Sequence, residues 1–128
     1  DWPVEPFDRQ HPVRAFFCDP RIGDKGGTSF HFGIDVSAPD GTPVYAIEPG
    51  QVHMEGAQNV GVVGRRTLGY WHLVPAVKHL QHVDRHTLLG HIAKGWAHVH
   101  LAEHSDGRYR NPLRPGALAP RLERMSDR

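Results

Sequence analysis

Five side chains in this sequence are of the types that bind metal ions and move protons. His31 and Asp35 are separated by three residues, and His98 and His100 by a single valine. His72 lies between the two pairs. Imidazole nitrogen and carboxylate oxygen are both good zinc ligands, and imidazole titrates near neutral pH. The set predicts one metal ion, held by a carboxylate and imidazoles, with histidines left over for acid–base work.

The backbone around the first pair cannot be a helix. Gly33 lies between His31 and Asp35, and Pro39 and Pro43 follow closely. Glycine permits a tight backbone and proline ends helices, so the pair is predicted on a strand or at a strand–loop junction.

The second pair is predicted on a strand over residues 97–102. Side chains alternate along a strand, so His98 and His100 should point to one face, with Cα atoms about 6.5–7 Å apart. Glu103 would fall on the opposite face, which makes it a poor general base. Glu48 and Glu55 are further candidates for a supporting or basic carboxylate.

Most of the eleven histidines must lie outside such a site, because one zinc ion takes three or four protein ligands. A second group is predicted to be solvent-exposed loop residues: His79, His82, His86 and His91. Trp71 and Trp96 are interpreted as packing residues rather than sugar-stacking platforms. Cys18 is the single cysteine, which excludes an internal disulfide, and its apolar neighbours predict a buried thiol.

Length and composition limit the class of protein. The 128 residues predict one domain, and 15 basic against 14 acidic residues give a formal charge of +1, so nucleic acid is not expected as a partner. No apolar run approaches the roughly 20 residues that span a bilayer, and the first residues lack a signal-peptide pattern. A monomer is expected.

Short strands separated by turns predict an all-β fold, a compact antiparallel sheet or sandwich with few or no helices. Residues 42–47 and 51–55 are predicted as a hairpin, and residues 59–65 and 68–73 as the next pair of strands. In the latter, Tyr70, His72 and Val74 should share one face. A glycine-rich loop is predicted over residues 19–28. The expected organisation is an extended lead-in (1–12), the domain (13–116) and a polar, frayed tail (117–128).

The order of motifs resembles the lysostaphin/LytM-type zinc endopeptidases. The similarity extends from about residue 13 to 113. It is carried by His31-Phe-Gly-Ile-Asp35, by Ala-Pro-Asp-Gly-Thr-Pro-Val-Tyr-Ala at 38–46, by Gly-Tyr-Trp-His-Leu at 69–73, by Leu-Gly-His-Ile at 89–92 and by His-Val-His at 98–100. The chain departs from the family pattern at Trp96, a bulky residue in an expected cleft loop, and at residues 101–102, where Leu-Ala replaces Phe-Glu.

The resemblance implies a zinc-dependent endopeptidase of bacterial cell-wall peptidoglycan, secreted or in the cell envelope. It implies that His31, Asp35 and His100 bind Zn²⁺, and that His72 and His98 are the catalytic pair. Two alternatives stand beside it. One is a non-catalytic metal-binding or regulatory domain of the same fold at the cell wall, and the other is zinc-dependent hydrolysis of a different peptide or amide.

Overall fold

The structure is a computed structural model that describes residues 1–22 and 28–118. Its regular elements in these ranges are all β-strands. In chain order they are β1 (Val13–Ala15), β2 (Pro20–Ile22), β3 (Thr28–Phe30), β4 (Ile34–Ser37), β5 (Pro43–Tyr45), β6 (Gly50–Met54), β7 (Asn59–Val63), β8 (Thr67–Trp71), β9 (Leu73–Pro75), β10 (His82–Val83), β11 (Leu88–Ile92), β12 (His98–Ser105) and β13 (Arg108–Arg110). The predicted all-β class is therefore confirmed.

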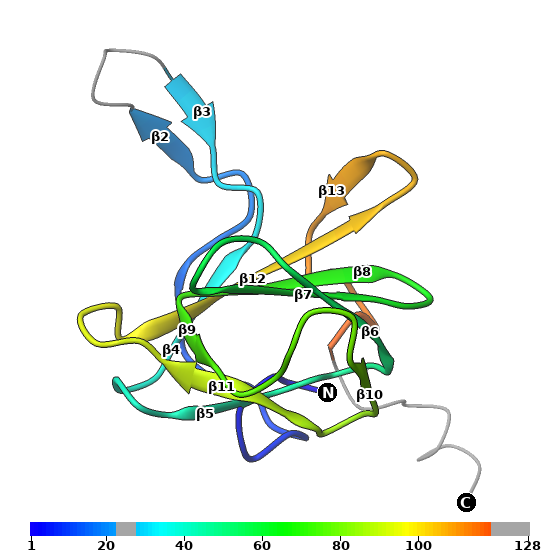
Figure 1. Ribbon diagram of the computed structural model, residues 1–128. Coiled ribbons are helices and arrows are strands. Elements are labelled where there is room, and N and C mark those ends of the chain that lie inside the picture. Colours follow the sequence, from blue (N-terminus) through cyan, green and yellow to red (C-terminus); the bar gives the residue numbers. More distant parts are fainter. Residues whose placement is uncertain (23–27, 119–128) are drawn as a thin grey trace, which may run out of the picture.

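The strands form one large and two small antiparallel sheets. The large sheet has the order β1-β4-β12-β8-β7-β6-β10, and β13 adds to β12. The smaller sheets are β5-β11-β9 and the hairpin β2-β3. In Figure 1 the β2-β3 hairpin and the β12-β13 hairpin project from the same side of the body. The sheet β5-β11-β9 lies on the side away from them.

The hydrophobic core joins the large sheet to the sheet β5-β11-β9. Alternate residues of each strand enter it, as a half-buried strand requires. The cluster contains Ile34, Val52, Val62, Tyr70 and Leu101 from the large sheet and Val44, Leu73, Leu89 and Ile92 from the small one. The opposite face of the large sheet is therefore left for the polar residues of β4 and β12.

One predicted hairpin is confirmed and another is wrong. β7 and β8 pair directly, as residues 59–73 predicted. β5 and β6, predicted as a hairpin around residues 48–50, belong to different sheets. The chain crosses between the sheets there, and the crossing is held where the backbone N–H of Ile47 donates to the Tyr70 hydroxyl at 3.0 Å. A buried tyrosine hydroxyl needs such a partner, and no local turn pattern reveals it.

The predicted face shared by Tyr70, His72 and Val74 is also wrong. Tyr70 is fully buried and Val74 is 56% exposed. The cause is His72, whose φ of 76° breaks the alternation between β8 and β9. The chain leaves the large sheet at this residue and enters the small one.

Two expectations near residue 20 are corrected. Residues 19–28, predicted as a loop, contain the strand β2 and the first residue of β3, while residues 23–27 lie outside the described part. Cys18, predicted to be buried, is exposed in a tight turn with φ 67°. Its backbone N–H donates to the carbonyl of His31 at 2.7 Å, so the turn directs the thiol to solvent.

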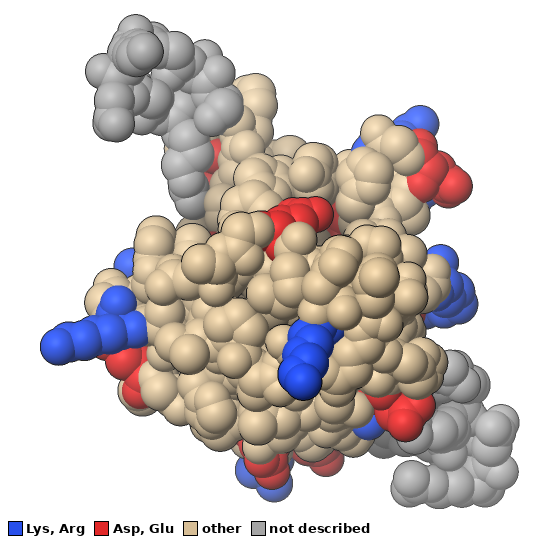
Figure 2. Space-filling view, viewed as in Figure 1, with Lys and Arg blue, Asp and Glu red and all other residues tan. Residues whose placement is uncertain are grey.

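The ends of the described chain lie against the body. Trp2 and Val4 are buried in the core, although residues 1–12 contain no strand, and Ala117 and Leu118 are buried too. The proposed limits of the domain at 13 and 116 stay a prediction, and residues 119–128 of the expected tail are outside the described residues. Among the residues described, no helix is suited to crossing a membrane. Basic and acidic side chains are scattered over the face in Figure 2 without a broad basic patch.

A buried ion network supports β12 from the core side. Glu103 is 1% exposed, on the face opposite His98 and His100 as predicted. It accepts from Arg66 Nη1 at 2.8 Å and from both Arg114 terminal nitrogens at 2.8 and 2.9 Å. Burial alone would raise the Glu103 pKa, but the Arg114 hydrogen bonds and the Arg66 charge outweigh it, so the pKa is lowered.

Replacing Glu103 by glutamine should destabilise the fold at neutral pH by about 3–5 kcal/mol, because the buried Arg66 then loses one of its two anionic partners and keeps only Glu48. A carboxylate with a lowered pKa contributes stability above its unfolded pKa, and this is lost as the pH falls through the folded value. The difference between wild type and E103Q in urea unfolding should therefore be largest at pH 7 and shrink below about pH 4. Glu55→Gln changes an exposed carboxylate and is the control, with a free energy of unfolding expected within about 0.5 kcal/mol of wild type. Equal free energies of unfolding for E103Q and E55Q at pH 7 would contradict the role of Glu103.

Candidate metal centre

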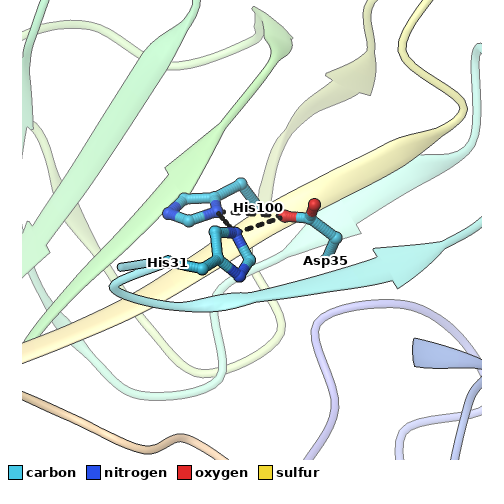
Figure 3. A group of neighbouring side chains, drawn as sticks. All are labelled: His31, Asp35 and His100. Carbon is cyan, nitrogen blue, oxygen red and sulfur yellow. Dashed lines mark hydrogen bonds and ion pairs between the residues drawn. The ribbon is translucent and has the colours of Figure 1, made fainter. Parts of the chain in front are cut away.

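Three of the predicted site residues meet in space, although they span 69 positions of sequence (Figure 3). His31 Nε2 lies 3.1 Å from Asp35 Oδ1 and 3.0 Å from His100 Nδ1. His100 Nδ1 lies 3.0 Å from the same oxygen of Asp35. The three atoms form a nearly equilateral triangle, and the two histidines are buried while Asp35 is half-buried.

Strand pairing places two of these residues side by side. Asp35 on β4 is the direct partner of His100 on β12. His31 comes from the short link between β3 and β4, which passes over both strands. Gly33 makes the close passage possible, because a Cβ there would lie 2.4 Å from the Leu101 carbonyl oxygen and 2.9 Å from the His100 ring. The tight backbone predicted from Gly33 is thus a packing requirement of the site.

The turn before β2 fixes the orientation of the His31 ring. His31 Nδ1 lies 3.0 Å from the carbonyl oxygen of Phe16. A carbonyl only accepts, so Nδ1 carries the proton, and a neutral ring then turns the Nε2 lone pair toward Asp35 and His100. No residue pattern indicates this contact, because its acceptor is a backbone atom 15 residues away.

The chemistry of these atoms fits a cation. A lone pair of His31 and a carboxylate oxygen face each other at 3.1 Å, and both are acceptors. Ligand atoms held at about 2.0–2.1 Å in a tetrahedral zinc site are about 3.3 Å apart, close to the observed separations of 3.0–3.1 Å. Two neutral imidazoles and one carboxylate are the donor set of catalytic zinc sites, which keep a position open.

Electrostatics keep Asp35 ionised. Burial acts to raise the pKa of Asp35, but its hydrogen bond with His100 and the nearby imidazoles of His98 and His31 lower it below the usual value. The carboxylate is therefore in the form that binds a metal ion at neutral pH.

The triad opens into a cleft of about 520 Å³ on the outer face of the large sheet. His72 and His98 line this cleft with the triad, so all five predicted site residues meet there. The other walls are aromatic: Phe30, Phe32, Trp71 and Trp96. Phe30 is 68% exposed and Trp96 41% exposed, so the interpretation of Trp96 as a packing residue holds only for the face that covers His72.

His98 is oriented by the loop that precedes it. Its Nδ1 lies 2.6 Å from the carbonyl oxygen of Trp96, so this nitrogen is the donor. The Nε2 atom is then turned toward the cleft, 3.6 Å from Asp35 Oδ2. A ring fixed in this tautomer can accept a proton beside the metal-binding atoms.

His72 is held beside His98 by ring contacts. Its ring stacks on Trp96 with centroids 3.6 Å apart and an interplanar angle of 6°, and meets His98 edge-on at 5.1 Å. Burial, followed by the charges of His98 and His100, lowers the pKa of His72 to about 4. His72 is therefore neutral at pH 7, with both a donor and an acceptor nitrogen.

The remaining candidate carboxylates lie outside the cleft. Glu48 pairs with Arg65 and Arg66, and Glu103 with Arg66 and Arg114. Glu55 is exposed at the end of β6. The four histidines predicted to be solvent-exposed loop residues are all exposed: His79, His82, His86 and His91. The loop assignment is wrong for His82 and His91, which lie on β10 and β11.

Known structures share this fold. Csd3 of Helicobacter pylori superposes with a TM-score of 0.70 and 20% identity over 88% of this chain and 33% of that one. A zinc containing peptidase of Vibrio cholerae gives 0.73 and 22% over 93% and 40%. The catalytic domain of the antimicrobial peptidase lysostaphin of Staphylococcus simulans gives 0.68 and 21% over 80% and 90%. No family model and no curated protein matches the chain.

The fold is that of the lysostaphin/LytM-type peptidase domains. The resemblance in fold that the sequence motifs predicted is therefore confirmed. The chain spans only about a third of the length of Csd3 and 40% of the Vibrio cholerae peptidase.

Zinc should stabilise this protein through the triad. At a free zinc concentration 100 times the dissociation constant, a site present only in the folded state adds about 2.7 kcal/mol and should raise Tm by roughly 10 °C. Asp35→Asn removes the anionic ligand, so this variant should show little shift. His91→Asn, an exposed histidine elsewhere, should keep the full shift. An equal zinc shift in D35N and wild type, measured by calorimetry, would place the metal elsewhere.

The titration of His72 can be followed directly. In the metal-free protein its imidazole proton resonances should stay in the neutral position as the pH falls from 8 to 5, and move with a midpoint near pH 4. Because the folded pKa lies below the unfolded value of about 6.5, the associated stability is complete above about pH 6.5 and declines as the pH falls toward 4. An NMR midpoint near 6.5 would show that the ring is not shielded from water.

Proposed function

We propose that this domain is a zinc-dependent endopeptidase that hydrolyses peptide bonds of bacterial cell-wall peptidoglycan. The observation that carries the proposal is the convergence of His31, Asp35 and His100 within hydrogen-bonding distance of one another, with His72 and His98 beside them. The likeness in fold to lysostaphin and to a zinc containing peptidase supports the same class of reaction.

The metal would be held by His31 Nε2, Asp35 and His100 Nδ1. Zinc in such a site supplies a Lewis acid and lowers the pKa of a bound water toward 7. The rest of the chemistry belongs to side chains of this chain. His98 accepts a proton at Nε2, since its other nitrogen is committed to Trp96 O. His72 is neutral and so donates an N–H to the oxygen that becomes negative as the peptide carbonyl is attacked.

The shape of the outer face suits an extended peptide. A second hollow of about 250 Å³ continues from the cleft, and the two share Phe32 and Trp71. Its floor contains Gly61, Gly69 and Ala102, three small residues paired across β7, β8 and β12. An endopeptidase must bind chain on both sides of the cleaved bond, and two adjoining hollows, one of them lined by the metal-binding triad, suit this requirement.

Peptidoglycan lies outside the cytoplasmic membrane, so the proposed activity requires a secreted or cell-envelope protein. We propose a monomer, since the cleft is built from one chain. The alternative, a non-catalytic domain at the cell wall, predicts zinc binding without turnover of any cross-linked muropeptide, and hydrolysis of a different amide predicts turnover in a wider substrate panel.

The test uses the zinc-loaded protein and purified peptidoglycan. Chelation should abolish release of new amino termini, and added zinc should restore it. His72→Gln should keep one zinc per chain and lose about 10²–10⁴-fold in kcat, the range for a residue acting on a proton in the transition state. The exposed His91→Gln is the matched control and should retain activity. Loss of zinc by H72Q would contradict the role given to His72. Absence of turnover by the zinc-loaded wild type would contradict the proposed endopeptidase activity.

A further inference from the structure

The loop of residues 93–97, between β11 and β12, contacts both histidines of the proposed catalytic pair. The Trp96 side chain lies face to face with His72, with ring centroids 3.6 Å apart. The Trp96 carbonyl oxygen accepts from His98 Nδ1 at 2.6 Å. The backbone N–H of Ala93 donates to the carbonyl oxygen of His72 at 2.8 Å. One short loop thus touches the ring of one histidine and fixes the tautomer of the other.

His72 depends on such a contact for its position. Its φ of 76° is unusual for a residue with a side chain, so the ring projects from a bend rather than from a regular strand. Among the contacts of the described residues, its ring nitrogens have no hydrogen-bond partner, and the closest ring is that of Trp96. The stack, not a hydrogen bond, therefore defines the direction of the imidazole.

The Asp40 carboxylate anchors the loop, in addition to backbone hydrogen bonds with His72 and Ala38. Asp40 Oδ2 accepts from the backbone N–H of Gly95 at 2.8 Å, and Asp40 Oδ1 accepts from that of Ala97 at 2.8 Å. These two hydrogen bonds lower the pKa of Asp40, and Lys94 adds to the effect against a small opposing effect of burial. Gly95 (φ 93°) and Ala97 (φ 51°) both have left-handed backbone conformations. A loop with two such residues needs an external restraint to keep one shape.

We infer that Trp96 and Asp40 are positioning residues, with Asp40 fixing the loop of residues 93–97, and Trp96 orienting His72 through its ring and His98 through its carbonyl oxygen. The catalytic consequence rests on the proposed function, but the positioning itself is a property of the folded chain. The two residues act at separate points. Removing the Trp96 side chain leaves its carbonyl oxygen in place, whereas removing the Asp40 carboxylate frees the backbone N–H groups of Gly95 and Ala97 on both sides of Trp96.

NMR of the zinc-loaded protein separates these effects without any substrate. In wild type the His72 imidazole C–H resonances should lie upfield, shielded by the indole face, and the His98 Nδ1–H should be a slowly exchanging, hydrogen-bonded resonance. Trp96→Ala should shift the His72 resonances downfield and keep the His98 resonance. Asp40→Ala should change both. Phe30→Ala removes another exposed aromatic from the same cleft and should leave the His72 resonances in place.

Kinetics on peptidoglycan add the second readout. Trp96→Ala should lower kcat by about 10²-fold with little change in KM, as expected when a reacting group is misplaced by about 1 Å. Trp96→Phe restores a ring for stacking and should recover most of the loss. Lys94→Ala, an exposed side chain of the same loop, should behave as wild type.

Unchanged His72 resonances in W96A would overturn the inference, and so would a kcat in W96A equal to that in K94A. If wild-type protein is inactive on every cell-wall substrate, the proposed function fails, while the NMR comparison still decides whether Trp96 and Asp40 position the two histidines. If D40A does not fold, the comparison of W96A with W96F still tests whether Trp96 orients His72. These variants are expected to fold, because Trp96 is partly exposed and is not among the residues of the hydrophobic core.

Discussion

Two acceptor atoms, His31 Nε2 and Asp35 Oδ1, face each other beside His100 Nδ1 in a partly buried pocket, and the rest of the structure depends on this constraint. His31 Nε2 and Asp35 Oδ1 cannot hydrogen-bond to each other while Phe16 holds the His31 proton at Nδ1. A proton on His100 Nδ1 could serve only one of them well, and His100 Nε2 is buried without a hydrogen-bond partner in the described chain. A cation would satisfy both acceptors and would also be bound by a deprotonated His100 Nδ1. Polar atoms gathered in this way are costly to the fold unless something binds them.

The fold supplies the rigidity that such a site needs. β4 and β12 are neighbours in the interior of the large sheet, so Asp35 and His100 are fixed by backbone pairing. On the core side of β12, the ion network of Glu103 ties this strand to the turn between β7 and β8 and to the segment after β13. The other parts of the site are loops, and each is held by hydrogen bonds: the turn at Cys18 to His31, and residues 93–97 to Asp40. Precise strands and tethered loops together make a preorganised site.

The sequence predicted much of this arrangement and missed parts of it for physical reasons. Period-two alternation placed His98 and His100 on one face and Glu103 on the other. The same rule failed at His72, because a single residue with positive φ changes the direction of the strand. A histidine at this position does not by itself indicate a positive φ. The hairpin at residues 42–55 was wrong because a turn pattern cannot tell pairing from a crossing between sheets. Contacts made by backbone oxygens, such as Phe16 with His31 and Trp96 with His98, leave no trace in residue types.

A crystal structure of the zinc-loaded protein, with anomalous diffraction recorded at the zinc edge, tests the central claim most directly. We expect a single strong peak bonded to His31 Nε2, Asp35 and His100 Nδ1, with a remaining ligand position facing the cleft. A peak at the exposed histidines instead, or a triad that keeps its present hydrogen-bonding distances around an empty centre in saturating zinc, would contradict the account.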